Sequence, residues 1–598
     1  MPGPFPADLP VTGDIGLTGS GFGLSSEGEL AEAEFAAAGL HQAGQPDAAA
    51  EPAGPQAPSL VRSSSVMAIG TLASRLTGFV RAAVVIFALG PAFLANAYNY
   101  ANTLPNTVYN LAIGGILTSV IVPLLVAAAK RDTDRGEKYA QRMFTLVTIA
   151  LAVITIGATL AGGAIAGLYG CAKQTCSAPP PVHAHYHFLL VLFAYFFIPQ
   201  IFFYGISSLA GAVLNARGSF AAPMWTPVIN NIVVIVVTAT FLVIAGTGAT
   251  VRDGYITWGE VWLLGVGTTL GIVIQTAALI PSLRRVGFRW RPRFDFMRAD
   301  IAEIGRMAGW MFGYILTTQV AYLVTARIAA RITASGRGFT AYQNAWLLFQ
   351  LPYAIVGISV ITALLPRMSA HATEDRYDLV RSDFSMGVRL GSVIVAPAAL
   401  VLAMVGPALS ELLFAWFNYS DSAARYLGLV FSVFSVGLMP YMLFQLLLRV
   451  FYALHDSRTP ALIGVVTMIA NVGTNLIAVT LVPTNDLVAA LGASFGLSNI
   501  VGCLLAWRLL SRRLGGLAGR AIGKSLARVH AAAVPAAFFA LVVTLGITAE
   551  FSTGKLSSAV IVVVGGGGGM LLYLVIAKTL RISEVTDLTG MVRSRLHR

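Results

Sequence analysis

Long, continuous apolar stretches separated by short polar connections make up most of the chain. Stretches of about twenty or more residues recur from residue 64 to residue 579, and that is the length a helix needs to cross the hydrocarbon core of a bilayer. Within lipid, only helices and closed barrels satisfy every backbone polar group. Because these runs do not alternate between apolar and polar residues, they indicate helices. We expect an all-α membrane protein with about fourteen transmembrane helices.

Charge on the connections predicts how these helices are oriented. The expected spans are residues 64–90, 94–128, 139–169, 188–215, 222–246, 258–282, 302–327, 341–366, 385–415, 424–453, 459–483, 486–510, 527–548 and 557–579. If the N-terminus is inside, the connections after even-numbered spans are cytoplasmic, and these carry most of the lysines and arginines. The opposite connections hold little besides Lys173, Arg252, Arg337, Arg425 and Lys555. The positive-inside rule then places both termini in the cytoplasm.

Composition excludes a soluble protein. Hydrophobic residues make up 56% of the chain and charged residues 11%, whereas a soluble domain carries about 25% charged residues. The net charge of +13 is explained by inside-positive loops, so we expect no nucleic-acid partner. Residues 1–60 contain acids but no lysine or arginine. They lack the basic start and apolar run of a secretory signal, and we expect a disordered acidic tail.

Two short motifs occur twice in the chain, and both pairs are separated by nearly the same number of residues. Pro123 and Pro366 close similar stretches 243 positions apart (366 minus 123), and Arg217 and Arg458 lie in similar turns 241 positions apart (458 minus 217). This offset predicts two parallel bundles of six helices each, as in transporters built from repeats. We expect an acidic cytoplasmic tail at 1–60, an N-terminal lobe with helices 1–6 at 61–283, a C-terminal lobe with helices 7–12 at 284–511, and helices 13–14 with a basic tail at 512–598.

Two arginines lie inside the first expected span. Charge at bilayer depth is costly unless it faces a wet cavity or a partner, and Arg75 lies near the middle of the span. Arg81, six residues on, points about 120° away on a straight helix. Gly78 between them would let the helix loosen enough for both to reach one cavity. We expect both to be functional; the alternative is that one or both snorkel to an interface or cap a neighbouring helix.

The second span carries a polar stripe. Asn99, Asn102, Asn106 and Asn110 follow helical spacing, with Asn96 one turn earlier. The stripe either lines a cavity or joins helices through amide hydrogen bonds. We interpret it as a cavity lining, because the preceding helix carries the arginines.

Other polar groups in the spans have less demanding explanations. Arg327 and Arg331 lie four residues apart near an outer helix end. They are explained by interfacial snorkelling, or by contact with an anion at the mouth of a cavity. Arg449 is expected to anchor a cytoplasmic helix end, and Asn230 and Asn231 to pack between helices.

Motifs for several kinds of chemistry are missing. The sequence contains no phosphate-binding loop ending in Gly-Lys-Ser/Thr, and the glycine run Gly565–Gly569 follows no strand. The histidines His183, His185 and His187 have no accompanying carboxylate. No nucleophile and base stand out as a pair. We therefore expect neither an enzyme nor a bound metal or cofactor. Whether Cys171 and Cys176 form a disulfide stays open.

Several motifs, in order and in similar spacing, resemble the MurJ (MviN) family over about residues 64–510. They are Ser74-Arg75-x-x-Gly78-x-x-Arg81, Leu104-Pro105-Asn106, Leu351-Pro352-Tyr353, Leu365-Pro366-Arg367-Met368-Ser369 and the segment from Phe451 to Pro460. This family comprises bacterial lipid II flippases within the multidrug/oligosaccharidyl-lipid/polysaccharide exporter superfamily. The resemblance implies fourteen helices, two six-helix lobes, and two further helices that form a groove for the lipid tail. It also implies alternating access for lipid II, the undecaprenyl-linked cell-wall precursor, in the bacterial plasma membrane.

The family pattern transfers only in part. Arg75 and Arg81 match the family's two cavity arginines, and the resemblance makes them candidates for binding pyrophosphate. The chain has Asn96 where the family commonly has an acid, Tyr109-Asn110 where many members have an arginine, and Trp346-Leu347 in place of an Asp-Arg pair. Arg327 and Arg331 are the candidates to replace the missing cations.

Two other functions fit the same sequence. One is a flippase or exporter for another polysaccharide-lipid or a drug. The other is a scaffold that transports nothing and recruits cell-wall synthesis proteins through the acidic tail.

Overall fold

The computed structural model describes residues 57–585. Residues 91–92, 110–135, 170–179, 218, 220, 247–255, 296–315, 333–336, 417–418, 455, 457, 552–553 and 583 lie outside the described part. The predicted acidic tail, as far as residue 56, also lies outside it, as do Cys171 and Cys176.

The described chain is helical and contains no strand, which confirms the all-α class. Within it, nine helices are long and apolar enough to cross a membrane. The number is ten if Asp421–Val436 and Leu438–Ala453, which meet at a bend of 46°, form one span. The expected spans at 94–128 and 302–327 run into undescribed residues. The count of fourteen therefore stays a prediction.

In chain order the helices are α2 (Ala57–Leu89), α3 (Phe93–Tyr109), α5 (Glu137–Leu160), α6 (Gly162–Tyr169), α7 (Pro180–Phe197), α8 (Gln200–Ala216), α9 (Ala221–Ala245), α11 (Trp258–Ala277), α12 (Ile280–Arg285), α14 (Phe339–Pro352), α15 (Ile358–Thr373), α16 (Tyr377–Phe414), α17 (Asp421–Val436), α18 (Leu438–Ala453), α19 (Arg458–Leu481), α20 (Leu487–Arg513), α21 (Gly519–Glu550), α22 (Lys555–Val560) and α23 (Gly568–Thr579). Residues 316–329 are also helical. Short π-helical segments, Tyr353–Gly357 and Ile561–Gly567, join α14 to α15 and α22 to α23.

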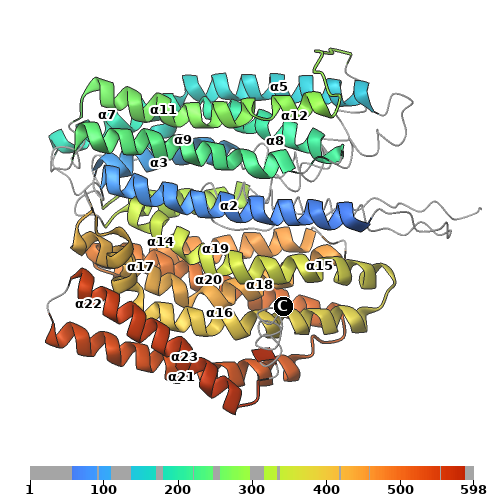
Figure 1. The fold of residues 1–598 in the computed structure, drawn as a ribbon, viewed down its shortest axis with the longest axis vertical. Helices are drawn as coiled ribbons and strands as arrows, with labels where there is room; N and C mark the ends of the chain where they lie inside the picture. Colours follow the sequence, from blue (N-terminus) through green and yellow to red (C-terminus); the bar gives the residue numbers. More distant parts are fainter. Residues whose placement is uncertain are drawn as a thin grey trace, which may run out of the picture.

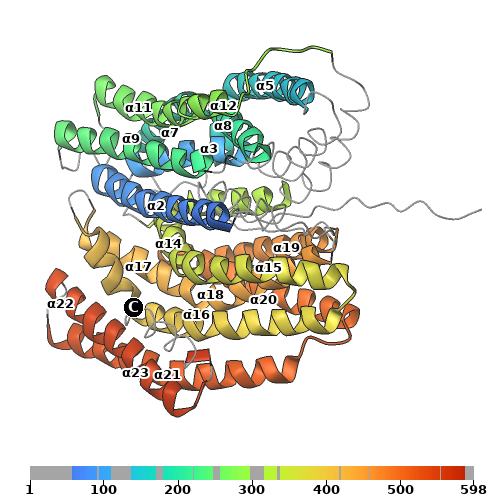
Figure 2. The same cartoon turned by 45° about the vertical axis from the view of Figure 1, so that its right-hand side comes forward.

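The helices run roughly parallel in two groups (Figure 1). The group from α2 to α12 occupies the upper part of the view, and the group from α14 to α20 the lower part, with α21–α23 outermost against α16. A view turned by 45° shows the same division (Figure 2). We call the end of the molecule where α2 begins the first end, and the end where α2 finishes the second end.

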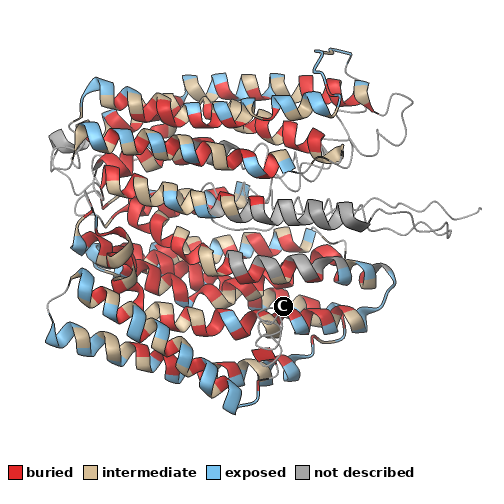
Figure 3. Cartoon of the chain, in the orientation of Figure 1, coloured by how far each residue is buried: buried red, intermediate tan, exposed pale blue. Residues whose placement is uncertain are grey.

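Burial follows this layout. Buried residues concentrate between helices, and exposed ones on their outer faces (Figure 3). The outer faces are apolar: Leu160 is 82% exposed, Val243 84% and Leu481 76%. A soluble monomer rarely exposes contiguous apolar surface on this scale. These faces therefore fit contact with lipid, as the composition predicted.

One contact recurs in both groups of helices. In the first group, Asn231 on α9 donates to the hydroxyl of Thr77 on α2 at 3.2 Å. In the second, Asn475 on α19 donates to the hydroxyl of Thr325 at 2.9 Å. The asparagines lie 244 positions apart (475 minus 231) and the threonines 248 (325 minus 77). These offsets are close to those of the sequence motifs and support the proposed division into two repeats.

The last helices are tied to the second group by polar contacts. The hydroxyl of Tyr573 donates to the backbone carbonyl of Val393 at 2.7 Å. The hydroxyl of Ser558 donates to the buried carboxylate of Glu411 at 3.0 Å. Beyond α23, Glu584 pairs with Arg389 of α16. Helices α21–α23 thus form a separate layer anchored to one long helix.

The interfacial anchor expected at Arg449 is wrong. This residue lies on α18 with 1% of its surface exposed, and its guanidinium lies 5.7 Å from the ring centroid of Tyr452. The sequence placed Arg449 near a helix end, but α18 is covered by α15, α16 and α20 along its length.

Candidate functional site

A polar cavity lies between the two groups of helices. Its volume is about 130 Å³. Helices α2, α3 and α9 form one wall and α14 forms the other. The polar lining residues are Arg81, Tyr98, Asn99, Asn102, Thr103, Asn231, Thr340, Gln343, Asn344, Trp346 and Gln350. Arg81 supplies the only side-chain charge among the described lining residues.

Arg81 of α2 is held in place by Asn231 of α9, the neighbouring helix in the same cavity wall. Its Nη1 donates to Oδ1 of Asn231 at 3.2 Å. The amide nitrogen of Asn231 donates in turn to the backbone carbonyl of Ser74 and the hydroxyl of Thr77, both at 3.2 Å. A Cβ at Gly78 would lie 3.5 Å from the Asn231 amide nitrogen, which is an ordinary contact, so the approach of α9 to α2 does not depend on glycine at this position. The asparagine thus orients the arginine and ties α9 to α2.

Asn96 of α3 joins the two groups at the second end. Its Oδ1 accepts hydrogen bonds from the backbone N–H of Thr340 at 3.1 Å and from the Thr340 hydroxyl at 2.7 Å. Asn99 donates to the same hydroxyl at 3.1 Å. Asn96 is 2% exposed and does not line the cavity. Its observed role is to connect α3 to the first turn of α14.

Further contacts extend this junction. Gln343 donates to the hydroxyl of Thr103 at 2.9 Å. The Tyr100 hydroxyl donates to the carbonyl of Ala326 at 2.6 Å, and its ring stacks on Phe339 at 3.9 Å between centroids. We call the contacts of α3 with α14 and with Ala326 the seam. It joins the two groups of helices at the second end with both hydrogen bonds and aromatic packing.

The α14 wall carries polar groups without partners. Asn344, Trp346 and Gln350 line the cavity and are each at least nine-tenths buried. Among the described residues, the Asn344 amide nitrogen, the Trp346 indole nitrogen and both amide atoms of Gln350 have no hydrogen-bond partner. A buried polar group left unpaired costs about 1–3 kcal/mol. This wall therefore offers hydrogen-bond donors and an acceptor to a polar group that enters the cavity.

Besides Asn96, which lies in the seam, the predicted site residues fall in three places. Arg81, Asn99 and Asn102 line the cavity. Arg75 and Asn106 belong to α2 and α3, but their side chains lie outside the described part. Arg327 is exposed and Arg331 half-buried, and neither lines the cavity.

Sequence reasoning missed the α14 wall and the role of Asn231. The signal for α14 was present: Thr340, Gln343, Asn344 and Gln350 repeat at helical spacing, as the asparagines of α3 do. For Asn231 no local signal distinguishes a packing amide from one that orients an arginine. Its role depends on α9 lying beside α2.

Apolar spans in two groups, with a charged cavity between them, define a class: polytopic α-helical membrane transporters. A solved structure of lipid II flippase MurJ in an inward closed conformation matches with a TM-score of 0.68 at 16% identity, covering 86% of this chain and 98% of that one. An inward-facing multidrug resistance MATE family transporter of the MOP superfamily matches with a TM-score of 0.59 at 15% identity, covering 74% of this chain and 95% of that one.

Sequence comparisons are more specific. A family model described as lipid II flippase MurJ matches residues 86–565. A probable lipid II flippase MurJ of Haemophilus influenzae is 26% identical over 68% of this chain and 79% of its own length. Lipid II flippase MurJ of Burkholderia cenocepacia is 24% identical over 72% of this chain and 80% of its own. The chain belongs to the MurJ family of lipid II flippases.

Proposed function

We propose that this chain moves lipid II from the cytoplasmic to the outer leaflet of the bacterial plasma membrane, for cell-wall synthesis, by alternating access. One observation carries the proposal: Arg81 faces a polar cavity between two groups of helices whose outer faces are apolar. A pyrophosphate cannot cross hydrocarbon unaided, and a guanidinium is well suited to bind its oxygens. The transport involves no covalent chemistry on the substrate.

The two walls of the cavity would bind different parts of the headgroup. Arg81, oriented by Asn231, would contact the pyrophosphate, and Arg75 would join it from the same helix. The α14 wall offers neutral donors and acceptors at Asn344, Trp346 and Gln350, which suit sugar hydroxyls and amides. This arrangement explains how the chain functions with Trp346-Leu347 where many relatives have an Asp-Arg pair.

The described conformation would have to open before it binds substrate. A cavity of about 130 Å³ equals roughly four water molecules at their share of liquid volume, which is too small for a lipid-linked sugar headgroup. The seam joins the two groups of helices at the second end, so we propose that opening occurs at the first end. We propose that the second end faces outward, that both termini are cytoplasmic, and that the lipid tail lies against α21–α23.

The test is complementation by full-length variants in cells depleted of their own lipid II flippase. Arg81→Gln removes the cavity charge, and we expect lipid II exposure on the outer leaflet to fall at least tenfold. Arg81→Lys should recover part of the activity, because it keeps the charge and loses the planar fork. Arg512→Gln, an exposed arginine of α20 away from the cavity, is the matched control and should transport normally. Normal exposure with Arg81→Gln, at equal membrane expression, would contradict the proposal.

A further inference from the structure

An arginine-rich segment crosses the first end of α5, far from the cavity between the groups. This segment, Gly287–Asp295, follows α12, and we call it the strap. Together with Glu137 and Gln141 of α5, it lines an open cleft of about 660 Å³. Its three arginines, Arg289, Arg291 and Arg293, all line the cleft. No residue is shared with the lining of the central cavity.

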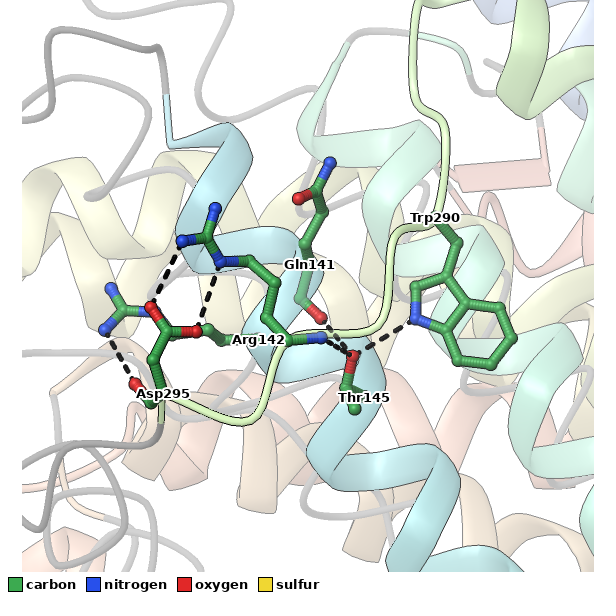
Figure 4. A network of polar contacts seen from close by, with 6 residues as sticks. Gln141, Arg142, Thr145, Trp290 and Asp295 are labelled. Carbon is green, nitrogen blue, oxygen red and sulfur yellow. Dashed lines mark hydrogen bonds and ion pairs between the residues drawn. The ribbon is translucent and has the colours of Figure 1, made fainter.

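Polar contacts fix the strap backbone to α5 (Figure 4). Gln141 donates to the carbonyl of Arg289 at 3.2 Å. The hydroxyl of Thr145 accepts from the Trp290 indole at 3.2 Å and from the backbone N–H of Arg293 at 3.1 Å. Arg142 donates to the carbonyl of Asp295 at 3.5 Å.

Aromatic packing reinforces these bonds. The ring of Phe144 lies 5.6 Å from Phe288 and 5.3 Å from Trp290, measured between centroids. The strap is therefore held at both ends and in the middle, although it has no regular secondary structure. The arginines it carries project from a fixed frame.

The carboxylates near the cleft are already paired. Glu137 forms an ion pair with Arg217 at 3.4 Å, and Asp295 with Arg293 at 3.1 Å. The hydrogen bond from Arg293 lowers the pKa of Asp295, so this acid is ionised and engaged. Among the described residues, no carboxylate lies within ion-pair distance of Arg289 or Arg291, and both are exposed. Within the part of the chain that the structure describes, the cleft thus presents two guanidinium groups that pair with no carboxylate.

The sequence order and the exposed aromatic residues of the strap indicate a position near the lipid headgroups. The membrane span Trp258–Arg285 ends immediately before it. The side chains of Trp290 and Phe294 are 46% and 71% exposed, and aromatic residues of this kind concentrate where the bilayer meets water. Every cation between residues 284 and 293 is an arginine, whose planar fork binds phosphate oxygens in pairs where a lysine offers only a point charge.

We propose that the strap binds the phosphate headgroup of an anionic phospholipid in the leaflet at the first end of the molecule. Arg289 and Arg291 contact the phosphate, while Trp290 and Phe294 lie at the edge of the acyl region. The positive-inside rule alone requires charge on this connection, but it requires neither a backbone tied to α5 along its length nor arginine in preference to lysine. The site would fasten the first group of helices to one leaflet while the second group moves.

The test measures lipid binding to the purified full-length chain in a neutral detergent. Phosphatidylglycerol, phosphatidylcholine and inorganic phosphate are titrated separately, with thermal unfolding and native mass spectrometry as readouts. We expect phosphatidylglycerol alone to raise Tm and to remain bound. Arg289→Gln/Arg291→Gln should weaken this binding at least tenfold. Arg289→Lys/Arg291→Lys keeps the charge and leaves the strap backbone bound to α5. It should weaken phosphatidylglycerol binding several-fold.

The matched control is Arg520→Gln/Lys524→Gln, which removes two exposed cations from α21 near the same end of the molecule. It should bind phosphatidylglycerol as the unaltered chain does. The proposal is wrong if the control loses as much binding as the glutamine variant of the strap. It is also wrong if the lysine variant binds as tightly as the unaltered chain, because the attraction would then be a non-specific charge effect. Equal stabilisation by inorganic phosphate would overturn the assignment to a lipid.

Discussion

Trp346 combines two roles that the sequence alone would assign to different residues. Its ring packs in an aromatic cluster, 4.9 Å from Phe495 and 5.1 Å from Phe349 between centroids. Its indole nitrogen, at the cavity wall, has no hydrogen-bond partner among the described residues. The first role is that of an ordinary core residue. The second makes Trp346 a donor available to a ligand.

Replacing Trp346 with Phe removes this donor and keeps an aromatic ring in the cluster. We expect the affinity for lipid II to fall about three- to tenfold, the equivalent of one net hydrogen bond of about 0.5–1.5 kcal/mol. Affinity for undecaprenyl pyrophosphate, which has the same tail but no sugars, should be unchanged. Binding to the purified protein, measured by native mass spectrometry, checks both. Arg81→Gln should weaken both ligands, and an equal loss of both with Trp346→Phe would contradict the division between walls.

The seam between α3 and α14 is the feature that matters at the scale of elements. Asn96, Asn99 and Gln343 make its hydrogen bonds between α3 and α14, and each bonds a threonine on the opposite helix. Asparagine at 96, in place of the acid common in the family, can accept from Thr340 without carrying charge into the seam. The polar stripe of α3 therefore does two things: near its start it joins helices, and further along it lines the cavity.

Thr340→Val should loosen the seam, because it deletes the hydroxyl that bonds Asn96 and Asn99 and keeps the shape of the side chain. We expect the ratio of molecules with the second end closed to molecules with it open to fall about 5- to 30-fold, which corresponds to a loss of about 1–2 kcal/mol in the stability of the closed conformation. Spin labels on Gly259→Cys and Ser422→Cys, exposed positions of the two groups at the second end, would report a longer mean distance. The background carries serine at Cys171, Cys176 and Cys503. Thr340→Ser, which retains the hydroxyl, should keep the shorter distance.

Orientation in the bilayer is a property of the whole molecule. The first end carries the strap and the arginines of α12 and α20, and the second end carries few cations among its described residues. The inside-positive rule therefore predicts that the first end is cytoplasmic. The same layout puts the phospholipid site in the inner leaflet and the seam at the outer surface.

Labelling of single cysteines in intact cells checks this orientation. A membrane-impermeant thiol reagent should modify Ser422→Cys at the second end and spare Arg520→Cys at the first end, both in the cysteine-free background. Permeabilised cells should allow both to react. The reverse pattern would invert the proposed direction of transport and would move the strap to the outer leaflet.

The sequence by itself determined the class of fold, the family and one wall of the cavity. Continuous apolar runs of membrane length indicate helices, because a helix satisfies all its backbone hydrogen bonds within one segment. The cost of placing charge in hydrocarbon singles out Arg75 and Arg81 from their positions within an apolar run, and of these Arg81 lines the cavity. These inferences succeed because they depend on residues close together in the chain, where helical periodicity and hydropathy act.

The tertiary structure decided which polar residues meet. Asn231 orients Arg81, Thr340 receives Asn96, and Arg449 is buried at 1% exposure, and none of these follows from local pattern. Each pairs helices separated by about 150 or more positions or buries a helix end under its neighbours. In a membrane, van der Waals packing and hydrogen bonds between helices fix which helix faces lie inward, and these contacts exist only after the bundle assembles. The chain thus specifies its helices locally and its site only through their assembly.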